Sequence, residues 1–133
     1  MNRPQQNLIN YRRQKARETL EDAEILFSHK RIFSVVNRIY YALFYEIIAL
    51  LLTQNLSSTK HSGVRSMFNE HFIKTGKVPV EIGKFYAHMF EFRQKGDYSD
   101  FIEFDVAKVE QWLMKAKQYL LELERIIETE IYR

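Results

Sequence analysis

Cysteine is absent from this chain of 133 residues. Without thiols the protein has no disulfide bond, no thiolate metal site and no cysteine nucleophile. Glycine and proline are also scarce, with four and two residues respectively. Because these residues end or redirect regular elements, their scarcity favours a few long helices over many short strands.

Long uninterrupted apolar runs are missing as well. The N-terminal stretch MNRPQQNLIN contains no apolar core of a secretory signal, so we expect a cytoplasmic protein. The most apolar segment, residues 35–52, reads VVNRIYYALFYEIIALLL. Glu46 interrupts it, and the apolar run that follows is far shorter than the roughly 18 residues of a membrane span. We therefore expect no association with a membrane.

Neither sign of charge dominates strongly, since the net charge is +3. A mildly basic chain permits nucleic-acid binding without arguing strongly for it. Five basic residues precede the first acidic residue, Glu18. A solvated, basic start of a helix is the more ordinary explanation of this cluster.

Apolar residues recur at helical spacing along the chain, which predicts an all-α fold. Short connections make consecutive helices antiparallel neighbours, so we expect a bundle of about five helices that forms one domain of residues 1–133. Residues 35–52 are apolar nearly all round and should form the buried central helix. The predicted helices span approximately residues 6–29, 34–54, 61–76, 80–95 and 106 onward.

Residues with known preferences mark several helix ends. Ser34 and Asp105 are suitable N-caps for the second and the last helix, because their side-chain oxygens can accept hydrogen bonds from free backbone N–H groups. Asn55, Gly76 and Gly96 are suitable stop residues, because asparagine and glycine tolerate the left-handed backbone conformation.

Motif spacing excludes several kinds of chemistry. Neither Gly-Lys pair, at residues 76–77 and 83–84, has the preceding glycine or the following Ser/Thr of a phosphate-binding P-loop. No histidine is preceded three residues earlier by a glutamate, as a di-iron bundle requires. The His-Glu-x-x-His zinc motif is also missing. We therefore expect no metal ion and no cofactor.

Arg93 lies on the apolar face of the predicted helix 80–95, in line with Tyr86 and Phe90. A charge on such a face must find a partner or extend to solvent. One explanation is that the cation complements the C-terminal dipole of its own helix. The other is that Arg93 lines a cleft, where it holds a phosphate or stabilises a developing negative charge.

Asn37, Arg38 and Tyr41 interrupt the apolar character of the central helix. Tyr41 lies one helical turn after each of the other two residues, so it shares a face with both. Buried polar groups need hydrogen-bond partners. These residues therefore form either an internal hydrogen-bond network or a polar pocket that faces Arg93.

Three further polar residues lie near predicted helix ends. His61 opens the third helix, where an imidazole is commonly structural and is by itself a weak candidate for acid–base chemistry. Asp97 and Tyr98 follow Gly96 in a predicted loop of residues 97–104. In such a loop an aspartate usually shapes a turn, and a tyrosine usually anchors the chain.

The order and spacing of three segments are typical of one family: NRIYYALFYEIIALL at 37–51, KHSGVRSMFNEHFIKTGKVP at 60–79 and FEFRQKGDYSDF at 90–101. With them the chain resembles the HEPN family, in particular its small stand-alone prokaryotic members, over nearly its whole length. The resemblance implies a bundle of four or five helices and commonly a homodimer. Many members look like toxins of two-gene systems whose partner is a nucleotidyltransferase antitoxin.

The resemblance also implies a site. Active members of the family are metal-independent endoribonucleases, and their motif is an arginine followed, after four to six residues, by a histidine. Arg93 matches the arginine, whereas the window that should hold the histidine contains Tyr98 instead. Arg93 is thus the catalytic residue that the resemblance implies, and Tyr98 is expected to assist it if the chain cleaves RNA. The resemblance also matches Asn37 to a polar position on the second helix. We expect Asn37 to bind RNA or a nucleotide together with Arg38, Tyr41, Asp97 and His61, which the residue pattern itself suggests.

Three hypotheses for the function follow. In the first, the chain is the toxin-like component of a nucleotidyltransferase/HEPN system that binds RNA or a nucleotide and cleaves RNA without metal at an Arg93/Tyr98 cleft. In the second, it is a catalytically inactive module that binds a nucleotide or a partner protein. In the third, it is a helical interaction protein in which Arg93 caps its own helix. The sequence leaves open whether His61 or His88 approaches Arg93 from elsewhere in the bundle.

Overall fold

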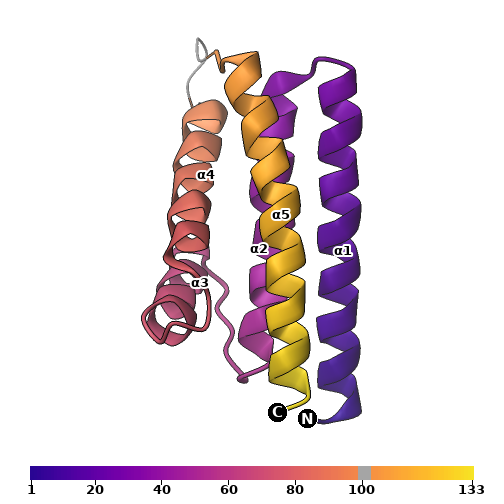
Figure 1. Ribbon diagram of the computed structural model, residues 1–133, viewed down its shortest axis with the longest axis vertical. Coiled ribbons are helices and arrows are strands. Elements are labelled where there is room, and N and C mark those ends of the chain that lie inside the picture. The colour runs from indigo at the N-terminus through magenta and orange to yellow at the C-terminus, as the bar shows by residue number, and fades with distance from the viewer. Residues whose placement is uncertain (99–102) are drawn as a thin grey trace.

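The computed structural model describes residues 1–98 and 103–133, apart from the side chains of Asp97 and Tyr98. This described part contains helices and no strand, which confirms the predicted all-α fold. Four long helices run along the longest axis of the molecule, and the short α3 lies across them (Figure 1). The elements are α1 (Arg3–Ser28), α2 (Ile32–Leu52), α3 (His61–Phe68), the π-helical turn η1 (Asn69–Ile73), α4 (Val80–Tyr98) and α5 (Val106–Ile131).

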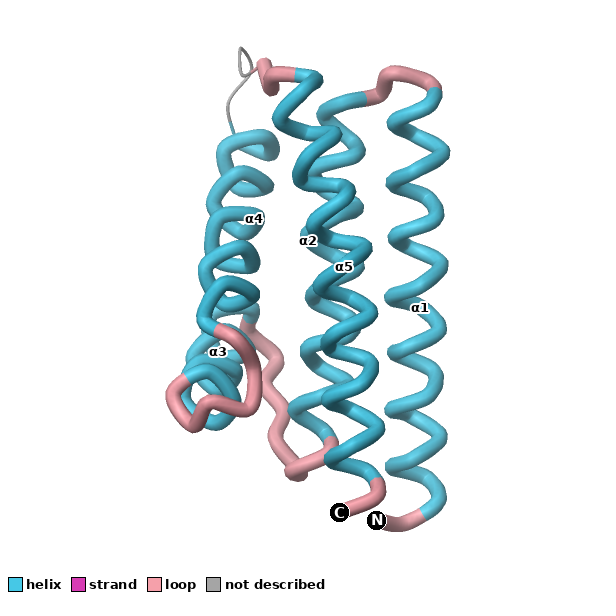
Figure 2. Tube along the Cα trace, viewed as in Figure 1, coloured by secondary structure: helices cyan, strands magenta, loops and turns pink. Residues whose placement is uncertain are grey.

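α2 is the central helix, as its sequence predicts. It packs against α1, α4 and α5, and 11 of its 21 residues are buried. By length and composition alone α2 could also cross a membrane, but the core helix of a bundle meets the same criterion, and α2 is mostly buried here. A tight turn joins α1 to α2, and the two chain termini lie together at the opposite end of the bundle (Figure 2).

The outer helices bury one apolar stripe each. In α5 seven apolar residues are predicted to recur every three or four positions. The first, Val106, is 52% exposed at the start of the helix, and the other six are buried: Val109, Leu113, Ala116, Leu120, Leu123 and Ile127. α1 buries the small residues Ala16 and Ala23 against α2, which allows the two helices to approach closely. Burying a large apolar side chain, such as a leucine or isoleucine of α5, stabilises the fold by about 1.5–3 kcal/mol before the entropy cost of ordering it.

Three of the five predicted helix-end residues act as expected. The Asp105 side chain caps α5 by accepting a hydrogen bond from the backbone N–H of Ala107 at 2.9 Å. Asn55 and Gly76 have φ angles of 58° and 78°, in the left-handed region that asparagine and glycine tolerate. Both lie in turns that follow the helices they were expected to end.

The prediction that Ser34 caps α2 is wrong, because α2 begins at Ile32. Lys30 adopts a left-handed φ of 59°, and the N–H of Arg31 donates to the carbonyl of Leu26 at 2.9 Å. This bond closes the end of α1 within a few residues. The chain therefore re-enters a helix before it reaches Ser34.

The prediction that Gly96 ends its helix is also wrong, and so is the loop expected to start at Asp97. α4 continues through Gly96 to Tyr98. A Cβ atom on Gly96 would lie 2.8 Å from the Cζ atom of Phe33, which is closer than such atoms approach. Glycine here lets the ring of Phe33 pack directly against α4 and does not form a turn, and a larger residue would displace that ring.

Candidate functional site

Arg93 lies in the second half of α4 and its guanidinium group contacts α2. The Nη1 atom donates a hydrogen bond to the Tyr41 hydroxyl at 3.2 Å. The Cζ atom lies 4.8 Å from the ring centroid of Tyr40 and 5.5 Å from that of Tyr41. Both distances are within the roughly 6 Å over which a cation is attracted by an aromatic face. The side chain therefore bridges two helices.

His61, the first residue of α3, reaches the same two tyrosines. Its Nδ1 atom lies 2.6 Å from the Tyr40 hydroxyl, and its ring packs edge-on against Tyr41 with centroids 5.9 Å apart. The His61 ring also stacks on the ring of Phe44, with centroids 4.4 Å apart. The structure thus brings His61 beside Arg93, although 31 residues separate them in the chain.

The environment of His61 favours a neutral imidazole. The pKa of His61 is lowered, first because burial disfavours the charged form and second because the positive charge of Arg93 repels it. Near neutral pH the ring consequently keeps a lone pair that can accept a proton or a hydrogen bond.

Tyr40 and Tyr86 extend the hydrogen-bonded chain into the core. Their hydroxyl oxygens are 3.4 Å apart and their rings stack with centroids 5.5 Å apart. Burial is the largest cause that raises the pKa of each phenol. Both hydroxyl groups are therefore neutral at physiological pH and can donate and accept hydrogen bonds.

Asn37 and Arg38 form the outer part of this arrangement. The Oδ1 atom of Asn37 accepts hydrogen bonds from Nη2 and Nε of Arg38, at 2.8 and 3.2 Å. The Arg38 Cζ atom lies 5.3 Å from the ring centroid of Tyr41, so one tyrosine ring contacts the guanidinium groups of both Arg38 and Arg93. We call the seven residues together the Arg93 cluster: Asn37, Arg38, Tyr40, Tyr41, His61, Tyr86 and Arg93.

A groove of about 340 Å³ borders the cluster. Asn37 and Arg38 form one wall, and the remaining lining residues are Leu26, Phe33 and Ser34. Phe33 is 43% exposed and adds apolar surface to the groove. The groove therefore offers an apolar surface beside a cation.

The remaining candidates for the site are His88, Asp97 and Tyr98. His88 is exposed, and its ring lies near Phe92, which stacks on Trp112 of α5 with centroids 4.6 Å apart. His88 therefore lies on the α5 side of α4 and not in the Arg93 cluster. The side chains of Asp97 and Tyr98, which the sequence also predicts at the site, lie outside the described part of the chain.

Sequence reasoning missed Tyr40, Tyr86 and the role of Phe44. Both tyrosines occupy apolar faces, where their aromatic bodies are typical of core residues. A signal was present, because Tyr86 precedes Arg93 by two helical turns on the same face of α4. A cation and a phenol in one buried line require partners for both.

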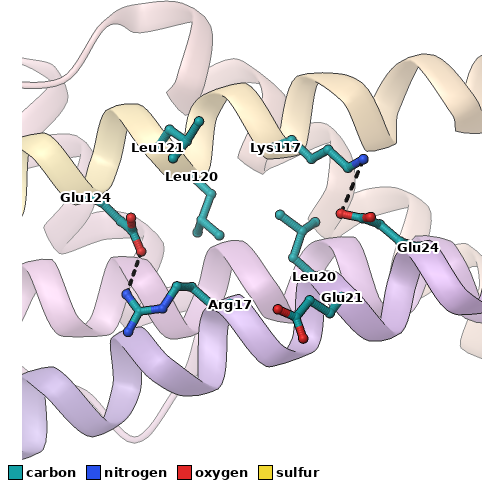
Figure 3. A pocket seen from close by; sticks show the side chains of 8 residues that line it. All are labelled: Arg17, Leu20, Glu21, Glu24, Lys117, Leu120, Leu121 and Glu124. Atoms are coloured by element: carbon teal, nitrogen blue, oxygen red, sulfur yellow. Dashed lines mark hydrogen bonds and ion pairs between the residues drawn. The ribbon is translucent and has the colours of Figure 1, made fainter.

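A second groove, of about 270 Å³, lies between α1 and α5 (Figure 3). Leu20 and Leu120 form its floor. Ion pairs join its two sides, between Arg17 and Glu124 at 2.8 Å and between Lys117 and Glu24 at 3.3 Å. The cations of this groove are thus paired with carboxylates across the two helices.

Within the described residues, no three histidine, aspartate or glutamate side chains gather closely enough to hold a metal ion. The groups that the Arg93 cluster presents are instead guanidinium cations, an imidazole, phenols and one amide. Such groups bind a phosphate and move a proton.

Comparison with known proteins agrees with the resemblance drawn from the sequence. The family model described as HEPN domain matches residues 9–126. A UPF0332 protein of Thermotoga maritima is 51% identical over 123 residues, which is 92% of this chain and 93% of that protein. A Methanocaldococcus jannaschii protein named "putative toxin" is 37% identical over 115 residues, or 81% of this chain and 78% of that protein. A second protein of that organism with the same description is 40% identical over 84 residues, or 63% of each chain. This chain therefore belongs to the HEPN family.

Proposed function

We propose that this chain is the toxin-like component of a two-gene system and that it binds and cleaves RNA, without a metal ion, at the Arg93 cluster. One observation carries the proposal: the guanidinium groups of Arg93 and Arg38 contact the same ring, Tyr41, at the surface of α2. Membership of the HEPN family and the relatives named as toxins support it.

The chemistry of the cluster suits a nucleic-acid ligand. A guanidinium group donates paired hydrogen bonds that match the oxygens of a phosphate. Arg93 can therefore hold the phosphate and stabilise the charge that develops on it during cleavage. Arg38 and the exposed ring of Phe33 border the adjoining groove, where a base can stack beside a neighbouring phosphate.

The proposal includes a cytoplasmic partner and a homodimer. A toxin must be neutralised in its own cell, and in the family that the chain belongs to this partner is expected to be a nucleotidyltransferase. Co-purification of the chain with the product of the neighbouring gene tests the partner. Size-exclusion chromatography with light scattering tests the dimer. A monomeric chain that does not bind the product of the neighbouring gene would contradict this part of the proposal. RNA cleavage is tested separately.

The competing function is a binding module that holds RNA or a nucleotide without cleaving it. Tyr98, standing in the window where the histidine of the family motif is expected, favours this alternative. A phenol with a pKa near 10 is a poor general base at neutral pH. The two functions differ in one observable, the appearance of shorter RNA fragments.

The experiment compares the purified chain with two variants, in chelator and with protein in excess over a mixed RNA pool. Arg93→Ala removes the guanidinium group that is proposed to bind the phosphate. Lys84→Ala is the matched control, because Lys84 is an exposed cation on the same helix outside the cluster. We expect Arg93→Ala to slow cleavage by roughly 100- to 1,000-fold, as the loss of one charge-stabilising donor does.

The control should cut at the rate of the wild type, and thermal unfolding should show that both variants are folded. Arg93→Ala that cuts as fast as the wild type would refute the proposed site. RNA binding without cleavage by the wild type would favour the binding module, and the absence of both would refute RNA as the ligand.

A further inference from the structure

We propose that His61 is the general base of RNA cleavage at the Arg93 cluster and that Tyr40 is the positioning residue that orients it. The inference rests on the proposed ribonuclease function and names the group that moves the proton. No histidine follows Arg93 in the sequence, and His88 lies outside the cluster, so a histidine that serves the cluster comes from another helix. α3 provides one.

The imidazole ring of His61 is held in one orientation. Its Nδ1 atom lies 2.6 Å from the hydroxyl of Tyr40, a residue that is 0% exposed. Its face stacks on Phe44, with an interplanar angle of 23°. His61 itself is only partly buried. Because Nδ1 is directed toward a buried phenol, Nε2 on the other side of the ring is the nitrogen that a ligand can reach.

The Tyr40 hydroxyl can set the tautomer. It lies between Nδ1 of His61 and the Tyr86 hydroxyl, at 2.6 and 3.4 Å. When Tyr40 donates to Tyr86, it accepts the N–H of Nδ1, and the lone pair is then on Nε2. The same arrangement persists when Nε2 gains a proton, because the imidazolium still donates from Nδ1 to the Tyr40 oxygen.

Charges around the ring keep it ready to accept a proton. The groups that face His61 are Tyr40, Tyr41 and Phe44 from α2 and the charged Arg93 from α4, and Arg65 follows one turn later on α3. Burial and the charge of Arg93 both disfavour the imidazolium. His61 is therefore largely unprotonated near pH 7, and once protonated it gives its proton away readily.

The proposed step is balanced within the RNA and the imidazole. Nε2 of His61 takes the proton of a ribose 2′-hydroxyl while the 2′ oxygen forms a bond to the adjacent phosphorus. The bond between phosphorus and the 5′ oxygen breaks, and the imidazolium returns the proton to that oxygen. Arg93 donates hydrogen bonds to the phosphate oxygens as their charge grows. The products are a 2′,3′-cyclic phosphate and a 5′-hydroxyl, and His61 ends neutral.

The test uses the full chain, a short fluorescent RNA and the same RNA with a 2′-deoxy sugar at the cleaved position. We expect His61→Ala to slow cleavage by roughly 100- to 10,000-fold, the contribution of a positioned general base, while the dissociation constant for the deoxy RNA changes less than about threefold. His61→Asn is the second variant, because its amide can still bond Tyr40 but cannot take a proton. His88→Ala, outside the cluster, should match the wild type.

Two further measurements separate a base from a structural residue. The cleavage rate of the wild type should fall on the acid side with a midpoint below 6.5, the usual pKa of an imidazole, and His61→Asn should lack this acid limb. Added imidazole should restore part of the activity of His61→Ala. The RNA product of the wild type should carry a 2′,3′-cyclic phosphate.

Each outcome decides between the two proposals. Loss of cleavage in both His61 variants with RNA binding retained supports His61 as the base. Full cleavage by folded His61→Asn, while Arg93→Ala is inactive, would overturn the role of His61 and leave the ribonuclease function standing. Wild-type protein that binds RNA but never cleaves it would overturn the role of His61 and favour the binding module. Wild-type protein that neither binds nor cleaves RNA would refute both proposals.

Discussion

The central helix α2 has polar residues on the side that faces α4 and on the side that faces α1 and α5. The groups that surround these residues differ between the two sides. Toward α4, Tyr40 and Tyr41 contact the cations Arg38 and Arg93 through aromatic faces and one hydrogen bond. Toward α1 and α5, Glu46 is 0% exposed, and neither of its carboxylate oxygens has a hydrogen-bond partner among the described residues.

On the α1–α5 side the neighbouring cations are paired with other carboxylates. Arg13 contacts Glu128 at 3.2 Å and Arg17 contacts Glu124 at 2.8 Å. Burial raises the pKa of Glu46 to about 8, and the negative charge of Glu124 adds to this, whereas Arg13 and Arg17 act in the opposite direction. Glu46 is therefore mostly protonated at neutral pH and behaves as a core side chain.

The difference shows how the proposed binding site is distinguished from a structural polar residue. On the α4 side the cations lie against aromatic rings, and a guanidinium group is the cation whose hydrogen-bond geometry matches the oxygens of a phosphate. The α1–α5 side pairs its cations across the helices and protonates the remaining acid. Tyr40 and Glu46 are both 0% exposed, so the proposed site differs from the surroundings of Glu46 in its neighbouring groups and not in burial.

The largest expected effect comes from removing the proton-binding group at Glu46. Between pH 4.5 and about 8 the folded state keeps a proton that the unfolded state loses, so the free energy of unfolding falls as pH rises. The stabilisation present at low pH is lost by about pH 8, and the total change is on the order of 5 kcal/mol. Glu46→Gln should abolish this slope.

Urea unfolding at pH 5 and pH 9 measures the slope. Relative to the wild type, Glu46→Gln should gain stability at pH 9, whereas any cost of its buried amide is the same at both pH values. Glu110→Gln is the control, because Glu110 is an exposed residue of α5. Equal pH slopes for Glu46→Gln and wild type would mean that Glu46 is ionised in the fold and that the two sides of α2 do not differ as described.

A smaller effect is expected at the opposite side, from Tyr40→Phe. This change removes the hydroxyl that contacts Nδ1 of His61 but keeps the ring that Arg93 covers. We expect kcat for RNA cleavage to fall by roughly 10- to 100-fold, the usual effect of losing a group that orients a reactive side chain, with KM nearly unchanged. Tyr86→Phe, one hydrogen bond further away, should have the smaller effect. A change confined to KM would show that Tyr40 contributes to binding and not to the orientation of His61.

The sequence predicted the fold correctly where the spacing of apolar residues determines which face of a helix is buried. From Val109 on, the residues of α5 that recur every three or four positions are buried, and α2, apolar nearly all round, is the central helix. Ser34 and Gly96 were misassigned because local preferences were overridden by tertiary structure. The turn at Lys30 starts α2 early, and Gly96 lies inside α4, where the ring of Phe33 packs against it.

The site could be predicted in part for the same reason. Helical spacing placed Arg93 on an apolar face and Asn37, Arg38 and Tyr41 near one another, and these residues meet in the structure. The position of His61 could not be derived, because it depends on how residues 53–60 return the chain so that α3 begins beside α2. Neither hydropathy nor spacing encodes that path.

A third prediction concerns the coupling of His61 to Arg93. Because the charge of Arg93 lowers the pKa of His61, Arg93→Gln should raise that pKa toward its usual value. Burial is the larger cause, so the pKa should remain below 6.5. NMR titration of the imidazole carbon-bound protons measures it, with Lys84→Gln as a control of equal charge change on the same helix. An unchanged pKa in Arg93→Gln would show that the two groups are not coupled.

The smallest effect is expected at the ion pairs that bridge the α1–α5 groove (Figure 3). The side chains of Lys117 and Glu24 are 47% and 44% exposed, so water and salt screen their attraction. Lys117→Ala should lower the free energy of unfolding by no more than about 0.5 kcal/mol, and a double-mutant cycle with Glu24→Ala should give a coupling that vanishes in 1 M salt. A coupling above roughly 1 kcal/mol that persists in 1 M salt would mean that the ion pair is shielded from solvent, as the carboxyl group of Glu46 is. In that case pairing across α1 and α5 would be part of the core, and the contrast between the two sides of α2 would rest on the Arg93 cluster alone.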